Sequence, residues 1–99
     1  MKKWRVFITP AAERVSKKLP KKVYEFIFNK FPNQAKENPF IGEQLSGSLS
    51  WLRSFHFSIG NQPYRIAYNL DIKSQEIFIH YAGHRNDFYE RLRKSLQLR

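Results

Sequence analysis

Residues that can bind phosphate and move protons gather near the end of the chain, in the segment Gly83-His84-Arg85-Asn86-Asp87-Phe88-Tyr89. Histidine titrates near neutral pH, and the guanidinium fork of arginine suits a phosphate that is gaining negative charge. Tyr89 lies one helical turn beyond Arg85 on a predicted helix, where it can hydrogen-bond a phosphate, stack on a base or donate a proton. These residue types at this spacing indicate proton transfer at a phosphate group.

Two more candidates come from alternation in the strands predicted before this corner. One phase is apolar and is expected to face the helices; it holds Phe55, Phe57, Tyr64, Ile66 and Tyr68. His56 and Arg65 then point to the opposite face, where Ser54, Ser58 and Ala67 leave room for a ligand. Taken singly, either residue is also compatible with a solvated side chain. Arg53 is in phase with the phenylalanines, so it ranks second, although twist or a bulge at the strand start can redirect it.

Other chemistries lack their residue sets. The chain has no cysteine and three scattered histidines, of which His80 is interpreted as structural, so no metal site and no cofactor are expected. No serine occupies a strand–turn–helix elbow, and Ser46-Gly47-Ser48 lacks the lysine and the spacing of a phosphate loop. The candidates for catalysis are therefore acid–base and cationic side chains.

The charge balance indicates the partner. Eighteen Lys and Arg against eight Asp and Glu give a formal net charge of +10, a strong positive field that favours RNA, DNA or an acidic protein as partner. Lys17, Lys18, Lys21 and Lys22 crowd one predicted helix–helix turn. They form either a solvated face or a surface that follows the phosphates of an RNA.

The predicted elements give a small α+β domain over residues 1–99, in the order β-α-α-β-β-β-α, in which helices cover one sheet face. Strands are expected at 4–9, 51–59, 64–70 and 76–82, with Gly83 ending the last strand and an irregular loop at 37–50. Helices are expected at 10–18, at 21–36 with Pro32 ending or kinking it, and after Gly83. No apolar run approaches the ~18 residues of a membrane span, so a cytoplasmic protein is expected.

The order of these elements, the strand Tyr64-Arg65-Ile66-Ala67-Tyr68 and the ending from Gly83 to Glu90 resemble the RelE/ParE superfamily of bacterial toxin–antitoxin toxins. The resemblance is clearest over residues 45–96. In its RelE branch it implies a metal-independent endoribonuclease that cuts mRNA, usually in the ribosomal A site, and a cognate antitoxin protein that wraps the toxin.

The resemblance also assigns site residues. The family's strand arginine falls on Arg65, its arginine after the last strand on Arg85, and its helix tyrosine on Tyr89; many relatives carry a histidine where His84 stands. Two strand lysines of the best-known branch fall on Ser54 and His56 and are missing, which leaves the general base open.

We therefore expect in-line attack of an RNA 2′-hydroxyl on its neighbouring phosphate. Arg65 and Arg85 stabilise the developing charge, His56 or His84 acts as base or acid, and Tyr89 is the other proton-transfer group. Arg53 and the four lysines of the helix–helix turn are expected to bind RNA. Two alternatives stay open: a ParE-like inhibitor of DNA gyrase, and a non-catalytic RNA-binding module.

Overall fold

Five strands form one sheet within residues 3–97, which are the residues that this computed structural model describes. They are β1 (Arg5–Ile8), β2 (Glu43–Gln44), β3 (Arg53–Ile59), β4 (Gln62–Asp71) and β5 (Glu76–His84), in the spatial order β1-β5-β4-β3-β2. The pairs β2–β3, β3–β4 and β4–β5 are antiparallel, and β1 runs parallel to β5. The predicted α+β fold and its antiparallel meander are confirmed. The short β2 falls inside the segment predicted as an irregular loop. The domain is predicted over residues 1–99, so its first two and last two residues lie outside the described residues.

The first helix forms where its capping residues predict it. The Ala12 N–H donates to Thr9 Oγ1 over 3.1 Å, and Pro10 opens α1 (Pro10–Ser16) at a position where its missing N–H has no cost. The turn after α1 leads into a second helical run.

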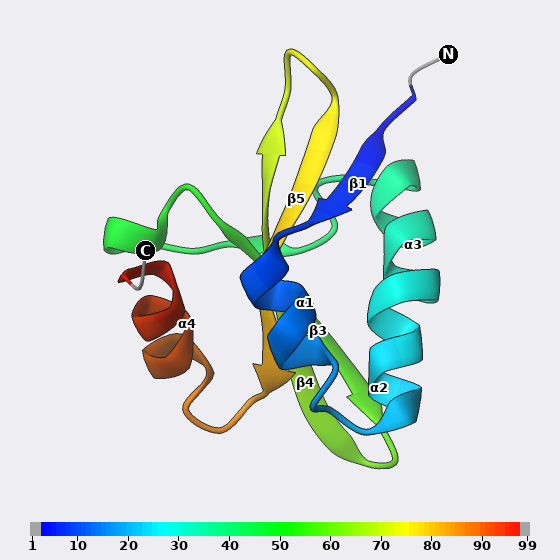
Figure 1. The fold of residues 1–99 in the computed structure, drawn as a ribbon. Helices are drawn as coiled ribbons and strands as arrows, with labels where there is room; N and C mark the ends of the chain where they lie inside the picture. The colour runs from blue at the N-terminus through cyan, green and yellow to red at the C-terminus, as the bar shows by residue number, and fades with distance from the viewer. Residues whose placement is uncertain (1–2, 98–99) are drawn as a thin grey trace.

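The second helical run is longer than Pro32 alone would allow. It comprises α2 (Lys21–Glu25), a wider π-type turn η1 (Phe26–Lys30) and α3 (Phe31–Glu37), and it appears as one rod in Figure 1. In an ordinary α-helix Pro32 would crowd the carbonyl four residues earlier and leave it without a donor. The wider turn directly before the proline relieves this conflict, because the Phe31 N–H donates to the Phe26 carbonyl five residues back. The helix therefore does not end at Phe31.

The main core lies between these helices and one face of the sheet. Its buried members from the helices are Ala12, Val23, Ile27, Phe31 and Ala35, and those from the sheet include Tyr64, Ile66, Tyr68, Ile77 and Ile79. The Phe26 and Phe57 rings stack with their centroids 4.2 Å apart, and Phe31 contacts both Phe55 and Tyr68. The predicted strand phase is confirmed, since the aromatic residues of β3 and β4 face the helices.

The opposite face of the sheet is partly covered by the C-terminal helix. The last helix, α4 (Phe88–Gln97), lies across the sheet from α2 and α3 (Figure 1). Its Phe88 and Leu92 join a second core with Ala67 and Tyr81 of the sheet, completed by Leu49 of the 3₁₀ turn η2 (Gly47–Leu49) and by Leu52. Phe88 and Leu92 are buried in this second core, and the end of this sheet face near His56 stays uncovered.

An irregularity in β5 changes which residues share a face. Ala67 pairs with Tyr81, whereas the next residue, Tyr68, pairs with Ile79, so His80 is an extra residue in β5. Such a bulge reverses the alternation beyond it. Tyr81 consequently faces α4, although the strict alternation of Ile77 and Ile79 would place it among the residues of the main core.

A buried tyrosine fixes the loop between α3 and β2. The Gly42 N–H donates to Tyr68 Oη over 2.8 Å, and Tyr68 Oη donates to the Pro39 carbonyl over 2.9 Å. Burial raises the pKa of the Tyr68 hydroxyl, which stays protonated and able to donate. This clamp sets where the loop enters β2 and hence where Glu43 lies.

We predict that Tyr68→Phe lowers the free energy of unfolding by about 1–3 kcal/mol, because it leaves a buried N–H and a buried carbonyl unpaired. Urea denaturation measures the change. Tyr24→Phe is the matched control, since Tyr24 is half-buried against the Phe28 ring and its hydroxyl has no hydrogen bond within residues 3–97. Equal midpoints for the two variants would contradict the clamp.

Candidate functional site

A row of residues across three strands forms the centre of the candidate site. His56 of β3 pairs with Arg65 of β4, and Arg65 pairs with Gly83 of β5, so the three lie on one face of the sheet. Because Gly83 has no side chain, the space beside Arg65 on the β5 side is not filled by the residue that pairs with it. His56, Ser58, Arg65 and Arg85 line one shallow hollow at the open end of this face. The structure thus brings together three of the predicted catalytic residues.

Tyr89 joins the cluster through Arg65. The Arg65 guanidinium carbon lies 5.1 Å from the centre of the Tyr89 ring, in the geometry of a cation–π contact. Tyr89 is half-buried in the first turn of α4, beside the buried Phe88, with which it makes an edge-on ring contact. The Tyr89 ring therefore packs against the face of the Arg65 guanidinium and leaves the edge of this group available to a ligand.

Gly83 has a role that differs from the expected one. The prediction that it ends the strand is wrong, because β5 continues to His84 and the left-handed backbone conformation occurs at Asp87, with φ of 58°. A Cβ on Gly83 would lie 3.4 Å from the Tyr81 ring, which is van der Waals contact, so the Tyr81 ring lies next to this position.

The ring of His56 is kept neutral by its surroundings. Partial burial lowers its pKa below the ordinary 6.5, and the positive charge of Arg65 lowers it further, while Glu43 opposes both. A histidine that is neutral at physiological pH has a free ring nitrogen that can accept a proton. The position that lacks the family's lysine thus carries a side chain suited to a general base.

Sequence reasoning missed Glu43. The two residues of β2 place it opposite Ser54, and cross-strand partners share a face, so Glu43 is the diagonal neighbour of His56. Its carboxylate is exposed on the same face as the hollow. The only sequence signal is one acidic residue in a segment without strand character, and it was too weak to identify the site.

His84 is separated from the other predicted catalytic residues. Beyond the bulge it pairs with Tyr64, whose ring it contacts edge-on at 5.4 Å on the main-core side of the sheet. Its Nδ1 accepts from the Asn86 N–H over 3.1 Å, so in the neutral ring Nε2 donates to Gln62 Oε1 over 2.9 Å. The two ring nitrogens thus join the turn between β5 and α4, at Asn86, to the start of β4, at Gln62. These contacts give His84 a structural role at the turn, and its acid–base role stays a prediction.

Arg53 also lies apart from the hollow, on the main-core face. Its Nε donates to the Gly42 carbonyl over 2.8 Å and its terminal nitrogen to the Phe40 carbonyl over 3.2 Å, and the guanidinium lies over the Phe40 ring. These contacts fix the loop that leads into β2. The RNA-binding role of Arg53 stays a prediction.

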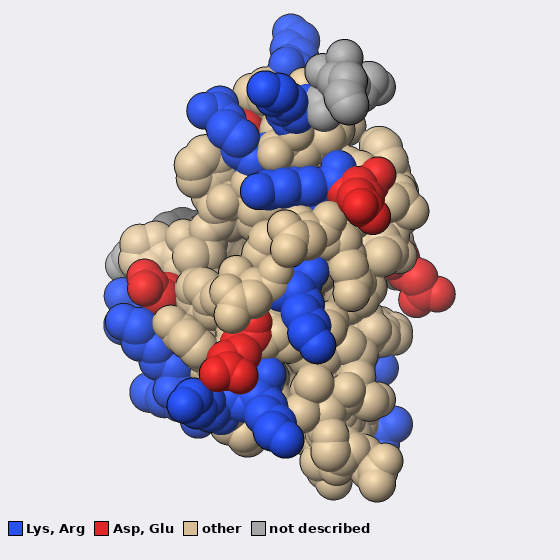
Figure 2. Space-filling view, turned by 90° about the vertical axis from the view of Figure 1, so that its right-hand side faces the viewer, with Lys and Arg blue, Asp and Glu red and all other residues tan. Residues whose placement is uncertain are grey.

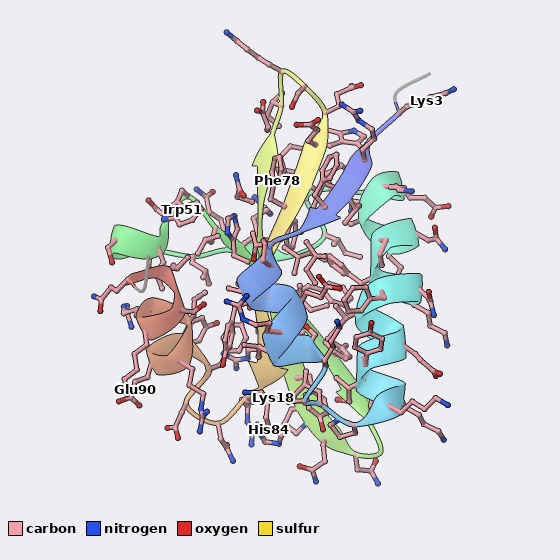
Figure 3. All side chains as sticks on the ribbon, in the orientation of Figure 1. Lys3, Lys18, Trp51, Phe78, His84 and Glu90 are labelled. Atoms are coloured by element: carbon pink, nitrogen blue, oxygen red, sulfur yellow. The ribbon has the colours of Figure 1, made fainter. Side chains whose placement is uncertain are left out.

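The lysines at the α1–α2 turn, Lys17, Lys18, Lys21 and Lys22, are exposed and form a separate basic region. Figure 2 shows blue side chains gathered at the lower left of the molecule, where this turn lies. Lys18 and His84 lie side by side in Figure 3 and line one groove next to α1. The basic region of this turn therefore lies next to His84 and α1 and is distinct from the hollow at His56.

The part of the chain between residues 3 and 97 contains no group of three or more His, Asp or Glu side chains that could hold a metal ion. Over the same residues, no helix is long and apolar enough to span a membrane.

The fold is that of RelE toxins. The chain resembles a double arginine-to-alanine mutant of Escherichia coli RelE in the free state, with a TM-score of 0.74 and 15% identity over 95% of this chain and 94% of that one. It also resembles the RelBE2 toxin–antitoxin complex of Mycobacterium tuberculosis, with a TM-score of 0.69 and 25% identity over 85% of this chain and 100% of that one. The RelE–RelB complex of Pyrococcus horikoshii matches with a TM-score of 0.61 and 24% identity over 85% and 97% of the two chains.

A family model for the ParE-like toxins of type II bacterial toxin–antitoxin systems matches residues 6–93. The chain therefore belongs to this family, and the predicted membership in the RelE/ParE superfamily is confirmed. No curated protein matches the chain in sequence at a significant level.

We predict opposite shifts of the His56 pKa in two variants. Arg65→Gln removes a neighbouring positive charge and raises the pKa toward 6.5, whereas Glu43→Gln removes a stabilising carboxylate and lowers it further. Titration of the histidine ring signals by NMR measures both. His80 is the internal control, since burial alone lowers its pKa and both variants leave it unchanged. Shifts of the same sign in the two variants would contradict the geometry of the site.

Proposed function

We propose that this toxin is a metal-independent endoribonuclease that cuts mRNA on the ribosome and so inhibits translation. The observation that carries the proposal is the shared hollow of His56, Arg65 and Arg85, with Tyr89 stacked on Arg65. It combines a neutral imidazole, two phosphate-binding forks and a hydroxyl in one place. RNA carries its own nucleophile, the 2′-hydroxyl, so these side chains suffice for its cleavage without a cofactor.

In the proposed reaction the His56 ring takes the proton of the 2′-hydroxyl, whose oxygen attacks the adjacent phosphorus. The bond from phosphorus to the 5′ oxygen breaks, and the Tyr89 hydroxyl supplies the proton that this oxygen gains. The products are a 2′,3′-cyclic phosphate and a 5′-hydroxyl. Arg65 and Arg85 donate to the phosphate oxygens as negative charge builds on them.

Glu43 acts as a positioning residue in this scheme. Its carboxylate lies diagonally across from the imidazole and stabilises the ring once it carries the accepted proton. The positive charge of Arg65 lowers the pKa of the His56 base, and the negative charge of Glu43 raises it.

The rest of the molecule supports binding to the ribosome in the cytoplasm. A net charge of +10 attracts RNA over long range, and the exposed lysines of the α1–α2 turn can contact phosphates of ribosomal RNA. Tyr89 also lines a second hollow with Gln44 and Arg93, where a nucleotide next to the cut can lie. A cognate antitoxin is the expected protein partner, as in the similar RelBE complexes.

We predict that His56→Ala slows cleavage of ribosome-bound mRNA by about 10² to 10⁴-fold and Arg65→Ala by about 10² to 10³-fold. His84→Gln should change the rate by less than about tenfold, because this residue supports a turn away from the phosphate. Primer extension on messages from translating ribosomes gives the rates. Lys30→Ala, at an exposed position of η1, is the control with unchanged cleavage.

A wild-type rate in Arg65→Ala would contradict the site. A loss in His84→Gln as large as that in His56→Ala would instead return the acid–base role to His84.

The match to ParE-like toxins favours inhibition of DNA gyrase as the second candidate function. The paired imidazole and tyrosine beside Arg65 have no use in such a role, and for this reason we prefer the ribonuclease. Purified protein added to a gyrase supercoiling reaction and to translating ribosomes separates the two. Inhibition of the first alone would exclude the nuclease, and RNA binding without cut products would indicate a non-catalytic module.

A further inference from the structure

A second row of side chains crosses the sheet at the end away from the hollow at His56. Phe7 of β1 pairs with Phe78 of β5, and Phe78 pairs with Asn69 of β4, so the three lie on one face. Asn69 and Arg65 alternate in phase along β4, so both rows lie on the same face of the sheet. The rows are roughly 13 Å apart, at about 3.3 Å per strand residue. The helix α4 covers the face between them.

Large rings are exposed in and beside this row. The Phe7 and Phe78 rings stack with their centroids 5.5 Å apart and 20° between their planes, and Phe7 is 42% exposed. Trp51 is 49% exposed and makes a T-shaped contact with the ring of His80, which follows Phe78 on the same strand. Phe78 and Trp51 both lie above α4 in Figure 3. We call Phe7, Phe78 and Trp51 the aromatic platform.

Polar groups border the aromatic platform on two sides. The Arg5 guanidinium carbon lies 5.7 Å from the centre of the Phe7 ring, and Arg5 Nη2 donates to Glu76 Oε2 over 2.6 Å. Arg5 is exposed, so its remaining N–H groups can reach a ligand. On the other side of Phe78, His80 Nε2 lies 2.7 Å from Asn69 Oδ1. Glu76 offsets the charge of Arg5, so it is the rings that distinguish this surface.

We propose that the aromatic platform binds unpaired bases of the same message that is cut in the hollow at His56. Every base has a flat π-face that stacks on an aromatic side chain, whatever the sequence. The inference rests on the proposed function for the identity of the ligand as the message. It adds a second RNA contact, remote from the cut, that is made by rings and not by the lysines of the α1–α2 turn.

The arrangement of the platform favours single-stranded RNA over a protein partner. In sheet-based RNA-binding domains, aromatic residues on the strands stack two or three bases, and arginine guanidinium planes stack in the same way. Phe7 and Phe78 lie on neighbouring strands, and Arg5 lies over the Phe7 ring. The amide of Asn69 can hydrogen-bond the edge of a stacked base. The net charge of +10 attracts a polyanion to any exposed face of the molecule.

A continuous path joins the platform to the cut. Tyr89, which stacks on Arg65, also lines the second hollow together with Ser46 and Leu49. Leu49 ends η2, and Trp51 follows it in the chain. A single strand that leaves the cut past Tyr89 therefore runs along η2 to Trp51 and from there to the paired phenylalanine rings.

The test replaces rings by leucine, which keeps the apolar character and removes the π-face. The test variant is Phe7→Leu with Trp51→Leu, and the rescue variant is Phe7→Tyr with Trp51→Tyr, which restores two flat rings. The matched control is Phe40→Leu. Phe40 is 53% exposed and also has an arginine over its ring, Arg53 at 5.3 Å, but it lies in the loop between α3 and β2. Fluorescence anisotropy with a labelled 20-nucleotide single-stranded RNA measures the affinity of each form.

We expect the leucine variant to bind this RNA at least about tenfold more weakly than the wild type, because two stacking faces are lost. The tyrosine variant and the control should bind like the wild type. A leucine variant with wild-type affinity overturns the proposal, as does an equal loss in Phe40→Leu or a loss that the tyrosines do not restore. A wild-type chain that does not bind the RNA overturns it too.

Photocrosslinking on the ribosome identifies the source of the RNA. The message carries 4-thiouridine on both sides of the A-site codon, and the crosslinked peptides of the chain are identified by mass spectrometry. We expect crosslinks to peptides that contain Phe7, Trp51 or Phe78. If these peptides crosslink only when the 4-thiouridine is in the ribosomal RNA, the occupant is ribosomal and the proposal is wrong. Platform crosslinks to a message that stays uncut would refute the proposed function alone.

Discussion

The pairing of β3 with β4 in a single register determines both the core and the site. His56 opposite Arg65 and Phe55 opposite Ile66 belong to the same ladder, and adjacent residues point to opposite faces. A slip by one residue would turn the phenylalanines away from the helices and bury the arginine. The hydrophobic effect that packs Phe26 on Phe57 therefore also holds the imidazole and the guanidinium side by side on the exposed face. The chemistry is positioned by the core.

Two further features limit where that chemistry can take place. The apolar stripe of α4 packs on Ala67 and covers the middle of the face, so the chemistry is confined to the open end near His56. The bulge at His80 then determines which side chains of β5 reach this end. It turns Tyr81 toward α4 and His84 toward the main core, and it leaves Gly83 opposite Arg65. The site is consequently built from β3, β4, the turn that carries Arg85 and the start of α4, with β5 contributing the space beside Arg65.

Much of this could be predicted from the sequence, because its signals are local. Alternation in 55–59 and 64–68 predicted which face His56 and Arg65 occupy, and Thr9-Pro10 predicted the start of α1. The bulge could not be predicted, since no glycine or proline marks His80. Alternation alone therefore could not predict that His84 lies opposite Tyr64 on the main-core face. Glu43 was missed because a two-residue strand has no pattern of its own and is positioned by the hydrogen bonds of Tyr68 to the preceding loop.

The most direct test of the account is the dependence of cleavage on the 2′-hydroxyl of the substrate. After the cut has been mapped on a ribosome-bound message, the same message is prepared with one 2′-deoxynucleotide on the 5′ side of that bond. The account predicts that the normal message yields ends with a 2′,3′-cyclic phosphate and a 5′-hydroxyl, and that the deoxy message stays intact. Cleavage of the deoxy message at the same bond would contradict a site in which His56 activates the 2′-hydroxyl of RNA.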